Sequence, residues 1–169
     1  TNGDTVNATS YGKISIYENI SGNWVQIGNN IYGENIGETI GVNGSMSLNY
    51  NGDILIVGGV ANNGVGAARI YEITNGSWIK TGEITNPSVS SFGKAVDINH
   101  VGNVIAIGDW STIVEIWENV GNSWQLKGQQ LSGTNTGHWG GPNGFGFSVS
   151  LNSVGDIVAI GARSDTING

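Results

Sequence analysis

The chain has 169 residues, enough for one domain with a sizeable core, and it contains 29 Gly but only 2 Pro. Its net charge is −7 and only 11% of its residues are charged, which excludes the basic patch that nucleic acids and anionic membranes require. There is no cysteine and hence no disulfide or thiolate metal site, and no apolar run approaches the roughly 18 residues of a membrane span. We expect no nucleic-acid partner and no membrane insertion.

The first predicted element is a hairpin that begins with residues 13–18, where apolar and polar residues alternate, and continues after a Gly-containing turn with residues 24–28. Alternation with period two is typical of a half-buried strand. The same unit occurs at residues 69–82 and 115–128, each time with an aromatic residue seven positions before a Trp. The three tryptophans are Trp24, Trp78 and Trp124. We predict that each one packs against a neighbouring strand and is substantially buried.

A second kind of hairpin alternates with the first. It occupies residues 42–58, 92–108 and 145–161, and in each copy a tight turn with Gly followed by Asp or Asn joins two short strands. The second strands are nearly continuous apolar runs, which favours strands that are covered on both faces. The turn glycines are Gly52, Gly102 and Gly155, at spacings of 50 and 53 residues. Four short strands in a repeat of about 50 residues indicate a β-propeller blade.

The predicted fold is therefore all-β, a β-propeller of four-stranded antiparallel blades with three repeats in this chain. The pattern divides the chain into a half-blade at 12–31, blades at 44–84 and 93–131, and a half-blade at 145–162. Propellers have about four to eight blades, and each half-blade leaves a strand edge unpaired. We expect completion either by another copy, as a homodimer with six blades, or by further sequence of a longer chain.

Two short motifs carry a resemblance to a known family. Phe145-Gly146 opens the last hairpin and Gly161-Ala162 closes it, and in this respect the chain resembles the FG-GAP-type repeats of integrin-α-like β-propellers. The Trp-containing hairpin is similar to a variety found in secreted proteins of marine bacteria and in some large viruses. The resemblance implies a propeller fold and an extracellular, cell-surface or virion-surface location. The first repeat departs from the pattern, because Val42-Asn43 stands where Phe-Gly is expected.

Many repeats of this family hold calcium in an Asp-rich loop between the first two strands. Here that link is only residues 152–155 in the last repeat, which is too short and too poor in carboxylates for the six to eight oxygen ligands that calcium takes. We therefore predict no metal site and no cofactor.

The antiparallel meander predicts short turns on one face of the propeller and long, dissimilar loops on the other. Variable loops on a rigid scaffold are the usual place for binding. The side chains in these loops that are best suited to hold a ligand are Tyr32, Asp109, Trp110, His138 and Trp139. Trp stacks on sugar rings or anchors a protein partner. The alternative is that these aromatic residues fold back onto the rims of the blades.

The leading functional hypothesis is a non-catalytic extracellular binding, adhesion or surface-display module, with a protein or glycan ligand on the long-loop face. One alternative is an enzyme that acts on polysaccharide, because a pair of carboxylates can supply the acid and the base for glycoside hydrolysis. The loop carboxylates available for this role are Asp4, Glu34, Glu38, Asp109 and Asp165. Another alternative is a purely structural component of a cell surface or virion.

Overall fold

The computed structural model describes residues 12–34, 38–41, 45–60, 65–89, 91–133 and 144–163. These residues contain sixteen strands and no helix, which confirms the all-β class. It follows that the described part of the chain has no helix that is long and apolar enough to cross a membrane. Every strand pair is antiparallel.

A single hairpin begins the described chain and is interrupted near its middle. Its four strands are β1 (Lys13–Ile14), β2 (Tyr17–Ile20), β3 (Asn23–Gln26) and β4 (Ile31–Tyr32). Strand β1 pairs with β4 and β2 pairs with β3, and the Ile27 N–H continues the ladder by donating to the Ile16 carbonyl at 3.0 Å. Within the described residues, the other edge of β1 and β2 has no partner strand.

The next two sheets share a four-stranded meander and differ in where a fifth strand pairs. The first contains β5 (Thr39–Ile40), β6 (Met46–Leu48), β7 (Ile54–Val60), β8 (Gly66–Thr74) and β9 (Ser77–Thr85). The second contains β10 (Ala95–Ile98), β11 (Val104–Gly108), β12 (Ile113–Val120), β13 (Ser123–Leu126) and β14 (Leu131–Ser132). The meander β6-β7-β8-β9 thus corresponds to β10-β11-β12-β13, while β5 pairs with β7 and β14 with β12.

The last sheet is the hairpin of β15 (Phe145–Leu151) and β16 (Val158–Ala162), which corresponds to the first half of a meander. Its register shifts between Phe145 and Ser148, where one strand carries an irregularity. In the part of the chain that the structure covers, the edge of β16 that faces away from β15 is unpaired.

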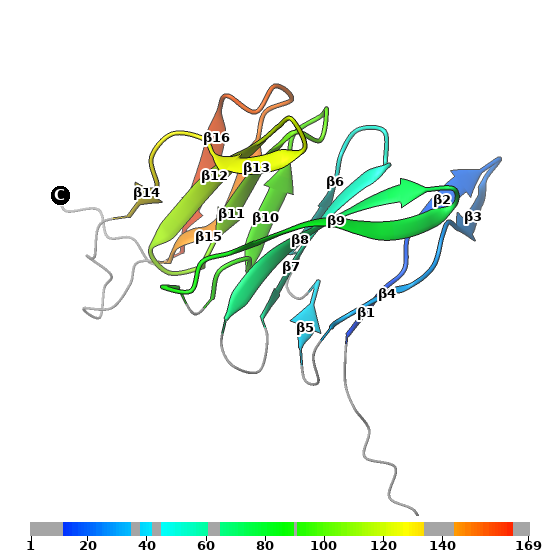
Figure 1. Ribbon diagram of the computed structural model, residues 1–169, viewed down its shortest axis with the longest axis horizontal. Helices are drawn as coiled ribbons and strands as arrows, with labels where there is room; N and C mark the ends of the chain where they lie inside the picture. Colours follow the sequence, from blue (N-terminus) through cyan, green and yellow to red (C-terminus); the bar gives the residue numbers. More distant parts are fainter. Residues whose placement is uncertain are drawn as a thin grey trace, which may run out of the picture.

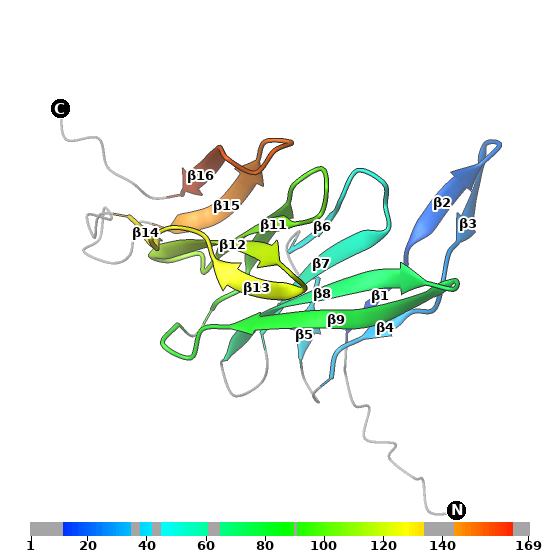
Figure 2. The ribbon, with the colours of Figure 1, turned by 45° about the horizontal axis from the view of Figure 1, so that its top comes forward.

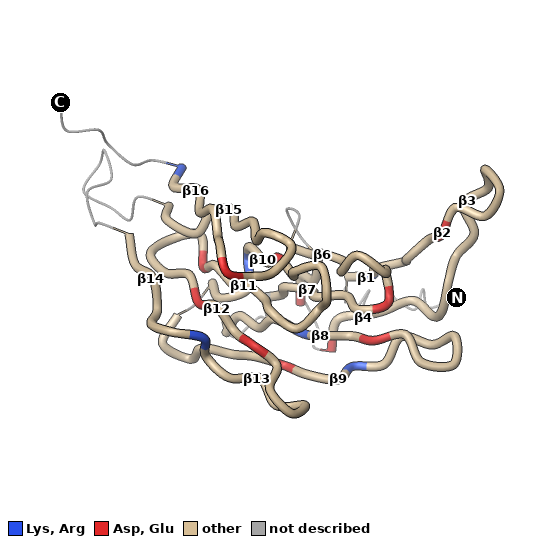
Figure 3. The backbone as a smooth tube through the Cα atoms, turned by 90° about the horizontal axis from the view of Figure 1, so that it is seen from above, with Lys and Arg blue, Asp and Glu red and all other residues tan. Residues whose placement is uncertain are grey.

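The four units stand in chain order in a row, from β1–β4 at one end to β15–β16 at the other (Figures 1 and 2). In the view from above, the first strands β6, β10 and β15 lie along one long side of the row, and β9 and β13 lie along the other (Figure 3). Neighbouring units are held together by apolar clusters between them. Their most buried members include Leu55, Ile56, Ile105 and Val104.

Glycines let the backbones of neighbouring sheets approach closely. A Cβ added to Gly58 would lie 1.7 Å from the Gly93 carbonyl oxygen, and one added to Gly108 would lie 2.4 Å from the Gly146 oxygen. Gly93 and Gly146 have φ of +88° and +77°, a left-handed conformation that side chains disfavour. The Phe-Gly motif therefore has a packing role: its Gly lies directly on a Gly of the preceding sheet.

Each interior Trp packs on the preceding hairpin. Trp78 is 3% exposed and its indole N–H donates to the Ile27 carbonyl at 3.2 Å. A Cβ on Gly28 would lie 2.6 Å from the Trp78 ring, so only glycine lets the indole lie on the backbone there. Trp124 is half-buried and lies on Gly82 in the same way. The predicted burial is confirmed for Trp78 and reached in part by Trp124.

The prediction was wrong for Trp24, which is 70% exposed. The reason is its position in the row, since no hairpin precedes β1–β4 in the described residues to receive the indole. At the opposite end of the row, the equivalent Gly has no Trp lying on it among the described residues. Gly128 occupies the repeat position of Gly28 and Gly82, and a Cβ placed on it would meet nothing within 4 Å.

Candidate functional site

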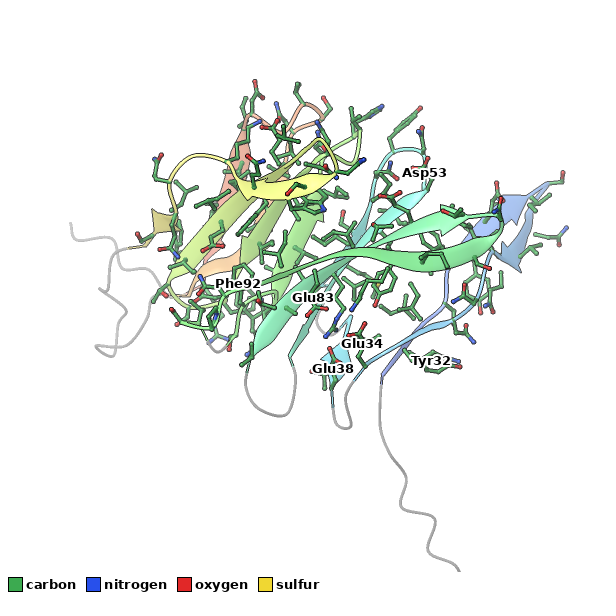
Figure 4. All side chains as sticks on the ribbon, viewed as in Figure 1. Tyr32, Glu34, Glu38, Asp53, Glu83 and Phe92 are labelled. Atoms are coloured by element: carbon green, nitrogen blue, oxygen red, sulfur yellow. The ribbon has the colours of Figure 1, made fainter. Side chains whose placement is uncertain are left out.

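The two ends of the strands differ in construction. Asp53 lies at one end, whereas Tyr32, Glu34, Glu38 and Phe92 lie toward the other (Figure 4). The first end carries the short turns that join β6 to β7, β10 to β11 and β15 to β16. The second end carries the described parts of the crossovers between sheets, at residues 86–89 and 91–94 for instance, and the link at 109–112 between β11 and β12. We call it the long-loop end.

An asparagine organises each short turn. The Asn99 side-chain oxygen accepts hydrogen bonds from the N–H groups of Gly102, Asn103 and Val104 at 2.9–3.1 Å, while its Nδ2 donates to the Val154 carbonyl of the next sheet at 3.2 Å. Equivalent bonds are made by two further residues, which are Asn49 and Asn152. This role of the asparagines was not predicted from the sequence. The signal was present as Asn three positions before each turn Gly.

The short turns are also tied to one another. The Tyr50 N–H donates to the His100 carbonyl and the His100 N–H to the Ser153 carbonyl, both at 3.2 Å. The Tyr50 and His100 rings stack with centroids 4.0 Å apart. Asp97, on β10, accepts from the Ser47 hydroxyl at 2.7 Å and from the Leu151 N–H at 2.7 Å. The contacts at the end with the short turns therefore hold neighbouring sheets together.

At the long-loop end, four side chains from successive segments form a stack in which two aromatic rings lie between two cations. The Lys94 Nζ lies 5.1 Å from the centroid of the Trp110 ring, the Trp110 and Phe147 rings are 4.8 Å apart, and the Arg163 Cζ lies 5.1 Å from the Phe147 ring. These distances are within the range of cation–π and ring-stacking contacts. Neither Lys94 nor Arg163 has a carboxylate within ion-pair distance among the described residues.

The backbone at Trp110 is unusual, with φ of +66° in a large non-glycine residue. Asp109 holds this conformation: its Oδ1 accepts from the N–H groups of Ser111, Thr112 and Ile113 at 2.8–3.0 Å. Asp109 is only 2% exposed, so its carboxylate builds the loop and does not reach a ligand directly. A strained residue that its surroundings fix so fully is a reason to look for function there.

Tyr32, another predicted site residue, is not part of this stack. It is 55% exposed and lies on β4, in the first unit of the row, where its hydroxyl accepts from Asn30 at 3.5 Å. His138 and Trp139 lie outside the described residues. Three residues that were not predicted, Lys94, Phe147 and Arg163, complete the stack instead. They lie beside one another only because segments far apart in the sequence meet.

A second cluster at this end contains only charged side chains. Arg69 is buried and bonds through Nη1 to the buried Glu38, and through Nε to Glu83 at 3.0 Å. Lys80 bonds to Glu34 at 2.6 Å and to Glu83 at 3.1 Å. The Glu34 N–H also donates to Glu38 at 2.8 Å. The loop carboxylates Glu34 and Glu38 therefore anchor the crossover between β4 and β5 to β8 and β9.

These contacts change the proton affinities of the cluster. Burial alone would lower the pKa of Arg69, but the hydrogen bond and charge of Glu38 outweigh it and raise that pKa above the ordinary value. The hydrogen bond to Glu34 raises the pKa of Lys80. Burial works to raise the pKa of Glu83, yet Lys80 and Arg69 together lower it. Arg69, Lys80 and Glu83 therefore stay charged around neutral pH.

Within the described residues, no group of three His, Cys, Asp or Glu side chains could hold a metal ion. Every buried side-chain nitrogen and oxygen atom there has a hydrogen-bond partner. No protein-family model matches the chain, and no significant match to a curated protein was found.

Proposed function

We propose that this chain is a non-catalytic binding module of the β-propeller type, which acts outside the cell or on a cell or virion surface and binds an acidic glycan at its long-loop end. The stack of Lys94, Trp110, Phe147 and Arg163 carries the proposal. Aromatic rings offer flat apolar surfaces to sugar rings. Two cations without a carboxylate partner among the described residues, in a chain of net charge −7, favour a ligand that is itself negatively charged.

The propeller architecture is supported by the repeated meander and by the packing of successive first strands along one side of the row (Figure 3). A non-catalytic role is supported by the structural contacts of the described loop carboxylates, which are occupied by ion pairs and hydrogen bonds within the chain. Glu34 and Glu38 bind Arg69 and Lys80, and Asp109 caps its own loop. Asp4 and Asp165, the other candidates for acid and base, lie outside the described residues.

The test is a binding assay on neutral, uronic-acid-containing and sulfated glycans. We expect the acidic glycans to bind and the neutral ones not to bind. Trp110→Ala should weaken binding at least about tenfold, a change of about 1.4 kcal/mol. A Lys94→Gln/Arg163→Gln double variant should reduce both the affinity and its dependence on salt.

Tyr50→Ala is the matched control, because Tyr50 is an aromatic residue that is 75% exposed at the opposite end of the strands. It should bind like the wild type. Melting temperatures of all variants establish that a loss of binding does not follow from unfolding. Unchanged affinity in Trp110→Ala, or binding that is equal for neutral and acidic glycans, would contradict the proposal.

A further inference from the structure

The two ends of the row carry complementary open edges. In the described residues, β16 pairs only with β15, and β1 and β2 pair only with β4 and β3. The Ile27 N–H bonds to the Ile16 carbonyl. Because alternate residues of a strand direct their backbone groups to opposite sides, the N–H and C=O groups of Ser15 and Tyr17 point to the open edge. Unpaired edges of this kind are templates for another strand.

In both complete sheets, the second and third strands of the meander pair in the same register. In the first, Leu55 lies opposite Tyr71 and Val57 opposite Arg69. In the second, the equivalent pairs have the same register. These are Ile105 with Trp117 and Ile107 with Glu115. Val158 and Ile160 of β16 occupy the repeat positions of Ile105 and Ile107, and Tyr17 and Ser15 occupy those of Trp117 and Glu115. If two copies of the chain pair in the same register, Val158 of one copy lies opposite Tyr17 of the other and Ile160 lies opposite Ser15.

The open faces also have matching shapes. A hollow of about 210 Å³ beside β16 is lined by residues that include Ile116, Leu151 and Val158. Tyr17 is 51% exposed, whereas Tyr71 at the same repeat position is 7% exposed. In the predicted register, Tyr17 of a second copy would fill this hollow as Tyr71 fills the space beside the first hairpin.

The other end shows a hollow of about 350 Å³, lined in part by Ile16, Leu48 and Gly52. In the interior, Gly102 lies on Ile54, with its added Cβ 2.5 Å from that side chain. Gly52 occupies the same repeat position as Gly102, and nothing lies within 4 Å of its added Cβ. Ile157 occupies the position of Ile54 and is 65% exposed. The open Gly and the exposed Ile are thus complementary.

A second pair of the same kind involves the repeated Trp. Trp78 lies on Gly28 and Trp124 lies on Gly82, so each Trp uses a Gly of the preceding hairpin. Trp24 is 70% exposed and Gly128 is uncovered. The same second-copy hairpin that pairs with β16 would carry its Trp24 to Gly128.

From these observations we propose that the chain assembles head to tail with a second copy of itself, through antiparallel addition of the first hairpin of one copy to β16 of the other. The register pairs Ser15 with Ile160, and Trp24 covers Gly128. Used twice, this interface closes two chains into a ring with a twofold axis and pairs the open edges of β16 and of β1–β2 in both copies. The proposal does not depend on glycan binding.

The chain contains no cysteine, so a designed cysteine pair gives a clean test of the register. Opposite residues of antiparallel strands have Cα atoms about 4.5–5.5 Å apart, within the range of a disulfide. A Ser15→Cys/Ile160→Cys variant should form a covalent dimer under oxidising conditions, seen on a non-reducing gel. The matched control is Ser15→Cys/Ala159→Cys, because a shift of one residue places the second thiol on the opposite face. It should remain uncross-linked.

Light scattering of the wild type, over a wide range of concentration, should give twice the mass of the 17.6 kDa chain. Trp24→Ala should raise the dissociation constant of the dimer at least about tenfold. Circular dichroism under reducing conditions checks that each variant is folded. A monomer at every concentration would overturn the proposal and assign the open edges to another occupant, such as further repeats of a longer polypeptide. Equal cross-linking of both cysteine pairs would overturn the register.

Discussion

The hairpin of β1–β4 and the hairpin of β8–β9 share the same sequence unit but have different environments. In the second hairpin, Trp78 is 3% exposed and Tyr71 is 7% exposed. In the first, Trp24 is 70% exposed and Tyr17 is 51% exposed. The difference comes from the preceding unit of the row, which supplies Gly28 to Trp78 and nothing described to Trp24.

A repeat unit therefore does not bury its own aromatic residues. Each unit presents an aromatic face to the unit before it and a glycine face to the unit after it. Burial is therefore a property of the interface between units, as in other repeat architectures where neighbours stabilise one another. Pairs of residues at equivalent interior and end positions test this directly.

The largest expected effect is at the repeated Trp. Trp78→Ala should lower the free energy of unfolding by about 3–5 kcal/mol, because it empties a buried site. Trp24→Ala in dilute protein should change it by less than about 0.5 kcal/mol, as for an exposed residue. Denaturant titration measures both. Equal losses in the two variants would mean that burial does not depend on the neighbouring unit.

A large effect is also expected at a glycine contact. In Gly58→Ala, the new Cβ would lie 1.7 Å from the Gly93 carbonyl oxygen, so the two backbones must separate. We expect a loss of about 3 kcal/mol, the upper end for overpacking. The equivalent end position is Gly161, where the added Cβ meets the Ser148 Oγ at 2.3 Å. That hydroxyl can rotate away, so thermal denaturation should show a smaller loss for Gly161→Ala.

A moderate effect is expected at the turn asparagines. Asn99 is 2% exposed, and its removal leaves three N–H groups without their acceptor. Asn99→Ala should cost about 2–3 kcal/mol. Asn152→Ala should cost about 1 kcal/mol, because water can reach two of the three N–H groups that it bonds, those of Asp156 and Ile157. Urea titration of both variants checks the order, and a larger loss for Asn152→Ala would contradict it.

The smallest effect is on the pH dependence of stability. Burial raises the pKa of Tyr71, while the phenol of the unfolded chain releases its proton near its ordinary pKa of about 10. The stabilisation is complete below about pH 10 and is lost as the pH rises toward the raised pKa. Between about pH 9.5 and 11, the melting temperature of Tyr71→Phe should therefore fall less than that of the wild type. A steeper fall of the melting temperature in the variant would contradict the expected direction of the pH dependence.

Both kinds of hairpin were predicted from the sequence, whereas the short strands β5 and β14 and their pairing were not. Period-two alternation in residues 13–18, the turn glycines and the repeat of about 50 residues are local signals, and each acts through neighbours along the chain. The Asn before each turn Gly was equally local and could have been found. The exclusion of a basic surface likewise follows from composition alone.

The contacts between sheets were decided only by tertiary structure. Trp110 meets Phe147 and Lys94 because three segments converge at the long-loop end, and no spacing in the sequence encodes that meeting. Asp109 turned out to cap a loop, because its neighbours offer three N–H groups. The burial of Trp78 and the exposure of Trp24 have the same cause: a repeat specifies which surface it offers, whereas the adjoining unit determines whether that surface is covered.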